Sequence, residues 1–131
     1  MSERFQLLNR NMPHIPREND LHNINGPSLL KVPDWISHPL GRYYLYFAHH
    51  EGQFIRLAYS DNLLGDWKVY EAGTLQLEQT ACLGHIASPD VHIAPDTREI
   101  LMYFHGPVAP ENDTLPDLAR QHPILGNQLL H

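Results

Sequence analysis

The chain has 131 residues and a formal net charge of −6, and 42% of its residues are hydrophobic. This length accommodates one domain with its own core, and this composition excludes a globally disordered chain. The sequence contains no cluster of lysine and arginine, which argues against a nucleic-acid partner. Its apolar runs are too short to cross a membrane, and its N-terminus lacks the apolar core of a signal peptide, so we predict a soluble, cytoplasmic protein without a membrane partner.

The first 24 residues are polar and irregular, and Pro13 and Pro16 block a long helix there. Eleven Pro and eight Gly interrupt the whole chain, and such frequent breaks favour short strands and turns over helices. Cys82 is the single cysteine, which excludes an intramolecular disulfide. We expect it to be a small, buried, apolar side chain.

From residue 25 to residue 80 the sequence predicts one four-stranded unit. Apolar and aromatic runs separated by turns rich in Gly, Pro and Asp place the strands at 28–32, 42–49, 54–60 and 67–70. In the last strand Trp67 and Val69 alternate with polar neighbours, so one face of this strand is expected to be buried. Four antiparallel strands joined by short turns make one blade of a β-propeller.

The beginning of this unit is repeated further along the chain. Pro27 and Pro89 each start the same pattern, which is Pro, five strand-like residues and Pro-Asp. An aromatic strand follows each copy, at Tyr43–His49 and at Ile100–His105. The two prolines are 62 positions apart (27 to 89), which indicates a repeated β unit. Such a unit needs neighbours that cover its faces.

The second unit is shorter than the first. We predict a partial blade over residues 81–107, where the β pattern ends. A short helix over Asp113–Gln121 and an apolar tail over Ile124–Leu130 are expected in residues 108–131. The predicted fold is therefore a single all-β domain, a partial β-propeller of one four-stranded blade and a partial second blade, with a C-terminal helix and tail.

Four segments together resemble the opening blades of glycoside hydrolase family 43 and its relatives. These enzymes are five-bladed β-propellers that act on arabinans, xylans and other plant-type glycans. The most telling match runs from Ser60 to Trp67, because a Ser-Asp-x-Leu stretch that continues to a Trp closes a blade in this family. The resemblance covers Asn25 to Pro107 and rests on the segments 26–32, 43–48, 55–67 and 88–92.

The resemblance also implies a set of three catalytic carboxylates, one from each of the first three blades, in an inverting mechanism. The position of the general base is occupied by Gly26, which cannot accept a proton. The Asp that tunes the acid is present as Asp90, whereas the acid Glu belongs to a third blade that this chain does not contain. We therefore expect a protein without hydrolase activity, and Asp90 is the best candidate if catalysis persists.

Candidate ligand-binding residues lie on the predicted inner strands and at strand ends, since ligands of propellers bind at the central channel. Asp90 and His92 are two residues apart and share one face of their strand. His49 and His105 are predicted to end equivalent aromatic strands. These groups are compatible with a hydrogen-bonded channel, with a retained sugar site, or with a metal site, but no ligand pair has a spacing that is diagnostic for a metal.

Other polar residues leave alternatives open. Three more of the ten histidines, His22, His50 and His85, lie near predicted strand ends. Arg56, in the middle of a strand, could bind a sugar hydroxyl or a carboxylate, or form an ion pair between blades. No cofactor and no metal ligands are predicted.

An unfinished propeller leaves apolar faces and a strand edge uncovered, so we expect the chain to associate with itself as a homodimer or homotrimer. The predicted function is that of a non-catalytic, glycosidase-like propeller module that self-assembles and binds an oligosaccharide. The alternative is a glycoside hydrolase whose active site is rebuilt at the oligomer axis around copies of Asp90, with His92 or His105 as partners.

Overall fold

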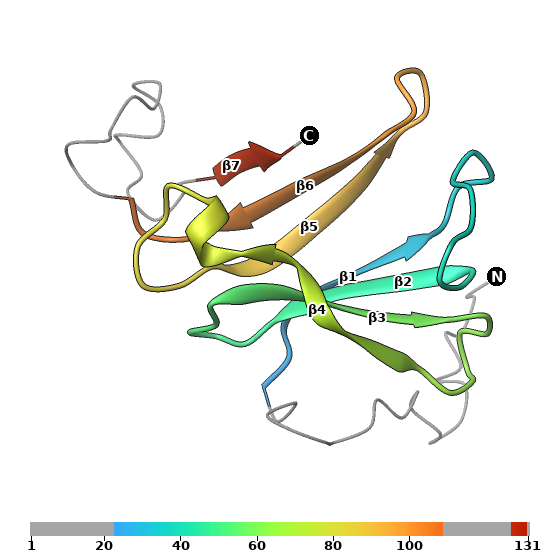
Figure 1. Cartoon of the computed structure of the whole chain (residues 1–131), viewed down its shortest axis with the longest axis horizontal. Helices are drawn as coiled ribbons and strands as arrows, with labels where there is room; N and C mark the ends of the chain where they lie inside the picture. Colours follow the sequence, from blue (N-terminus) through green and yellow to red (C-terminus); the bar gives the residue numbers. More distant parts are fainter. Residues whose placement is uncertain (1–22, 109–126, 131) are drawn as a thin grey trace, which may run out of the picture.

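The computed structural model describes residues 23–108 and 127–130, which form two antiparallel β-sheets (Figure 1). The prediction of an all-β chain whose first unit has four strands is confirmed. No helix within the described residues is long and apolar enough to span a membrane. The first sheet contains β1 (Asn25–Lys31), β2 (Tyr43–Ala48), β3 (Phe54–Ser60) and β4 (Lys68–Gln76). The short 3-10 helix η1 (Leu77–Gln79) follows β4. The second sheet contains β5 (Ala87–Ala94), β6 (Glu99–His105) and β7 (Asn127–Leu130).

β4 is longer than its sequence pattern predicts. It continues six residues beyond Tyr70, through a polar stretch in which the alternation of apolar and polar residues is lost. The pairing of β3 with β4 shifts between Ile55 and Leu57, and this bulge keeps the longer strand in the sheet. The predicted alternation itself is confirmed, since Trp67 is buried and Val69 packs beside it.

Residues 127–130, which the sequence assigned to an apolar tail, form β7 instead. β7 pairs antiparallel with β6 and becomes the third strand of the second sheet, drawn in red in Figure 1. The edge of β6 is therefore covered by the same chain. The helix predicted over Asp113–Gln121 lies outside the described residues.

The main hydrophobic core lies between the two sheets and draws on both of them. Its largest fully buried side chains are Phe104, Ile55 and Ile86. Burial, together with the neighbouring Tyr44, raises the pKa of Tyr46 to about 12, so this core phenol stays neutral. Because the core is shared, neither sheet buries its apolar face alone.

Cys82 belongs to this core, as the sequence predicts. Its side chain is buried, and burial raises the pKa of its thiol despite a hydrogen bond with Thr80. A buried thiol that resists ionisation is a poor nucleophile. Cys82 is therefore a packing residue.

A second hydrophobic cluster lies on the opposite face of the first sheet. Phe47, Ala58 and Trp67 are buried there, and the indole nitrogen of Trp67 donates to the carbonyl oxygen of Leu63 (3.4 Å). Leu29, on the same face, is 54% exposed. This face is thus covered at its centre and open at β1.

The two copies of the repeat share an unusual backbone feature. Gly26 and Ser88, the residues before the two repeated prolines, both have φ = +51°. Each copy also shifts the register with its partner strand at this place. Each inner strand therefore begins with the same bulge, and Ser28 in the first unit is the counterpart of Asp90 in the second.

The register of the second strands corrects one prediction. Asn25 pairs with Ala48 in the first unit, and Ala87 pairs with His105 in the second. His105 is therefore the counterpart of Ala48, and the expectation that His49 and His105 end equivalent strands is wrong by one residue. His49 lies just beyond the end of β2.

The two units join along a seam at which β1 and β5 lie side by side (Figure 1). The hydroxyl of Ser88 donates to Oδ1 of Asn25 (2.6 Å), and the backbone N–H of Val91 donates to Oγ of Ser28 (2.9 Å). Both hydrogen bonds join residues 63 positions apart, which is close to the repeat length. Equivalent strands of the two units thus run in the same direction along the seam.

Gly26 permits the closest approach at the seam. A Cβ atom at this position would lie 2.5 Å from Cα of Ser88, and φ = +51° is a conformation that favours glycine. A side chain here would push the two inner strands apart. The close packing of β1 against β5 therefore explains why position 26 is a glycine.

The Gly26→Ala substitution is expected to lower the free energy of unfolding by about 3 kcal/mol. Of this, about 1 kcal/mol comes from the left-handed backbone and the remainder from the forced separation of β1 and β5. Gly84→Ala is the matched control, because Gly84 has φ = +80° but open space around its Cα. Gly84→Ala should lower the free energy of unfolding by about 1 kcal/mol, the contribution of the left-handed backbone alone. Urea unfolding measures both, and equal losses would contradict this account of the seam.

Candidate functional site

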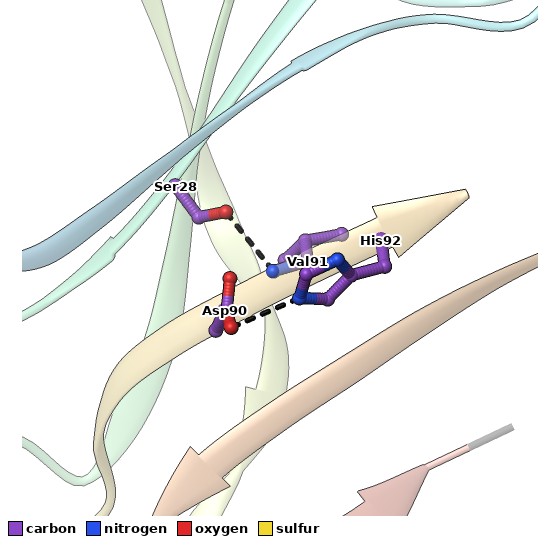
Figure 2. Close-up of polar contacts among 4 residues, drawn as sticks. All are labelled: Ser28, Asp90, Val91 and His92. Carbon is purple, nitrogen blue, oxygen red and sulfur yellow. Dashed lines mark hydrogen bonds and ion pairs between the residues drawn. The ribbon is translucent and has the colours of Figure 1, made fainter.

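The side chains of the predicted pair, Asp90 and His92, contact each other on β5 (Figure 2). Nε2 of His92 lies 2.9 Å from Oδ2 of Asp90, and the side chains are 55% and 67% exposed, respectively. The ring of Tyr103, from β6, meets the imidazole edge to face at 5.8 Å between centroids. Val91 between them is buried in the core, so Asp90 and His92 share the opposite face of the strand, as predicted.

The first unit has different residues at the equivalent positions. Ser28 stands where the second unit has Asp90, and Leu30, which is 5% exposed, stands where it has His92. Ser28 and Leu30 face the neighbouring sheet, because Ser28 bonds Val91 and Leu30 lies in the shared core. In the second unit an acid and an imidazole thus occupy the face that the first unit uses for docking.

A second group of polar side chains gathers where β1 and β5 begin and β2 and β6 end. We call it the seam cluster, and its members are Asn25, His50, His85, Ser88 and His105. The side-chain amide of Asn25 donates to Nδ1 of His50 (3.2 Å) and accepts from Ser88 (2.6 Å). The rings of His85 and His105 meet edge to face, with centroids 6.1 Å apart.

The electrostatics of the seam cluster favour the neutral form of His105. Burial lowers the pKa of His105, and the nearby His85 and His50 lower it further. The hydrogen bond from Asn25 requires an unprotonated Nδ1 on His50. At neutral pH the imidazole of His105 is therefore uncharged, and the cluster offers hydrogen-bond donors and acceptors to a polar ligand.

A metal site is not supported by the arrangement of side chains. Within residues 23–108 and 127–130 no three His, Cys, Asp or Glu side chains are placed to hold one ion. The histidines of the seam cluster are spaced for hydrogen bonding and ring contact instead.

The structure does not bring His49 and Arg56 into either group. His49 accepts the backbone N–H of Glu51 at Nδ1 (3.2 Å) and so stabilises the turn after β2. The guanidinium of Arg56 lies 4.9 Å from the ring centroid of Phe54, a cation–π contact within β3. In the sheet Arg56 pairs with Phe47, on the face away from the core between the sheets.

A pocket of about 240 Å³ lies elsewhere, beside the turn between β3 and β4. Polar groups of its lining are engaged in the protein's own hydrogen bonds. The hydroxyl of Ser60 donates to two carbonyl oxygens of the turn, and Asp61 accepts the backbone N–H of Arg42, before β2. The residues around it are Leu40, Tyr59, Ser60, Asp61, Asn62, Asp66 and Lys68. None of the residues selected from the sequence lines it.

Sequence reasoning missed Asn25 and Ser88 as members of a site. Neither is a residue type that signals chemistry on its own, and their hydrogen bond joins positions 63 apart. Aligning the repeat does mark Ser88, because it occupies the position of Gly26 before the second proline. The pairing with Asn25 follows only from the docking of the two units.

Comparisons with known proteins identify one longer relative. An uncharacterised protein of Acanthamoeba polyphaga mimivirus is 32% identical over 123 residues, which cover 81% of this chain. The chain spans about a third (34%) of the length of that relative. No family model matches the sequence, and no solved structure matches the fold. The similarity therefore indicates common ancestry with part of a viral protein.

Replacement of His105 should reduce the dependence of stability on pH. Because the pKa of His105 is below its ordinary value of 6.5, the unfolded chain binds a proton at this residue more readily than the folded chain. Stability is therefore lost as the pH falls below about 6.5. The variant His105→Ala introduces the residue found at the equivalent position of the first unit, Ala48. Its free energy of unfolding in urea should change less between pH 7.5 and pH 5 than that of the wild type. The control is His38→Asn, in an exposed loop, and an unchanged slope in His105→Ala would contradict the prediction.

Proposed function

We propose that this chain is a non-catalytic module of the β-propeller type that self-assembles and binds carbohydrate. The observation that carries the proposal is the seam, at which equivalent strands of two repeats lie side by side in the same direction. Radial repetition of a four-stranded sheet about an axis requires this relation between neighbours. The resemblance to glycoside hydrolase family 43 points to a sugar as the ligand.

The seam cluster is the proposed carbohydrate site. It lies at the end of β1 that carries Gly26, the position of the general base in the family. Gly26 has no functional group, and a side chain there would collide with Ser88, which argues against catalysis. The imidazoles of the cluster, the hydroxyl of Ser88 and the amide of Asn25 match the donors and acceptors of sugar hydroxyl groups.

Isothermal titration calorimetry with arabinose- and xylose-containing oligosaccharides tests the site. We expect binding that weakens by about threefold to tenfold in His50→Ala, the loss of one hydrogen bond. His50 is exposed, and the bond between Asn25 and Ser88 does not depend on it, so the variant should fold. His92→Ala is the matched control on the other polar group and should bind as the wild type does. Absence of heat with every oligosaccharide, or equal affinity of His50→Ala, would exclude this site.

A glycoside hydrolase built around Asp90 is the second candidate. The carboxylate of Asp90 is held by His92 and is open to solvent, so an acid of this kind is accessible to a substrate. Copies of Asp90 brought together in an oligomer would raise the pKa of one of them, as a general acid requires. The candidate needs at least two copies, since a pair of carboxyl groups performs this reaction.

A screen of aryl glycosides separates the two candidates. The non-catalytic module should show no turnover, whereas the hydrolase should show turnover that Asp90→Asn abolishes. Asp61→Asn serves as the control for a general loss of negative charge, because Asp61 lies in the turn after β3. Turnover that survives Asp90→Asn would eliminate the hydrolase as described here.

A further inference from the structure

The second unit has an outer face that mirrors a docking face of the first unit. By register, each residue of this outer face has a counterpart that contacts the neighbouring sheet. Leu30, Tyr46 and Ala48 lie in the core between the sheets, Tyr44 packs against it, and Ser28 bonds Val91. The outer face of the second unit consists of Asp90, His92, Leu101, Tyr103 and His105, the counterparts of Ser28, Leu30, Tyr44, Tyr46 and Ala48.

The first unit has the complementary face. Val91 and Met102 of the second sheet are buried against the first sheet, and their counterparts in the first unit are Leu29 and Leu45. Leu29 is 54% exposed, whereas Val91 is 7% exposed. The docking face of the second unit is thus covered within the chain, and the equivalent face of the first unit is open at β1.

We infer that a second copy of the chain docks its first sheet on the outer face of the second unit, head to tail. The contact repeats the part of the interface between the two units at which β1 meets β5, since Phe47 is already buried at the centre of the open face. It rests on the proposed self-assembly. In this contact Asp90 takes the role of Ser28 and accepts the backbone N–H of Leu29 from the next copy. Leu29 takes the role of Val91, whose N–H Ser28 accepts within the chain (Figure 2).

The chemistry of the two faces fits this assignment. A carboxylate accepts an amide N–H more strongly than a hydroxyl does. Only Oδ2 of Asp90 is engaged by His92, so Oδ1 is the oxygen assigned to the amide. The exposed Lys31 lies two residues beyond Leu29 on the same face of β1, opposite His92 in this register, and its long side chain brings a positive charge near the carboxylate of Asp90.

A head-to-tail contact differs from a two-fold dimer in a measurable way. Its two faces belong to different surfaces of one chain, so each can be disabled separately. Asp90→Lys disables the outer face, because it replaces the group that accepts the N–H of Leu29 with a cation. Leu29→Glu disables the complementary face by placing an acid against Asp90. Both residues are exposed, so both variants should fold, and circular dichroism checks this.

Light scattering over a range of concentrations measures the mass of each protein and of an equimolar mixture of the two variants. We expect the wild type to associate and each variant alone to associate at least tenfold more weakly. The mixture should associate, because each variant retains the face that the other lacks. Asp90→Ser, which restores the acceptor of the first unit, should still associate. If Leu29→Glu does not fold, the experiment uses Lys31→Glu, which lies on the same face of β1.

The outcomes separate the inference from the proposal beneath it. A wild type that is monomeric at every concentration would overturn self-assembly, and the head-to-tail contact with it. A wild type that associates while both variants associate equally well would overturn the assigned faces alone. Variants that fail to pair with each other, although each is monomeric alone and the wild type associates, would overturn the head-to-tail geometry.

Discussion

The close contact between the backbones of β1 and β5 is the constraint on which the rest of the structure depends. Gly26 lets the two strands approach, and the hydrogen bonds of Ser28 and Asn25 to the second unit fix their register. With this register set, the apolar faces of the two sheets meet and form the shared core. A shift of the seam would break these hydrogen bonds and move the core residues of both units.

The contact between β1 and β5 also determines the surroundings of Gly26 and of the seam cluster. It fills the space around Gly26, so the position that the resemblance assigns to a general base serves packing. It also brings together histidines from three segments far apart in the sequence, beside Asn25 and Ser88. Asp90, by contrast, lies with His92 on the face of β5 that points away from the shared core.

Local patterns predicted the strands well, and contacts between distant segments escaped them. The strand Phe54–Ser60 follows from an apolar run between two turns, and the burial of Trp67 follows from alternation. The shared face of Asp90 and His92 follows from their spacing. The extension of β4 depends on a bulge, and β7 depends on the open edge of β6, so neither is visible in a local period. The position of His105 opposite Ala87 likewise required the register of a folded sheet.

The central claim is that the two repeats are joined by hydrogen bonds along the seam, and amide hydrogen exchange at Val91 tests it most directly. The account predicts that the N–H of Val91 is protected as strongly as amides inside the sheets, because Ser28 accepts it. In Ser28→Ala this protection should fall while that of the neighbouring core amides remains. Rapid exchange at Val91 in the wild type would show that the two units do not dock in this way.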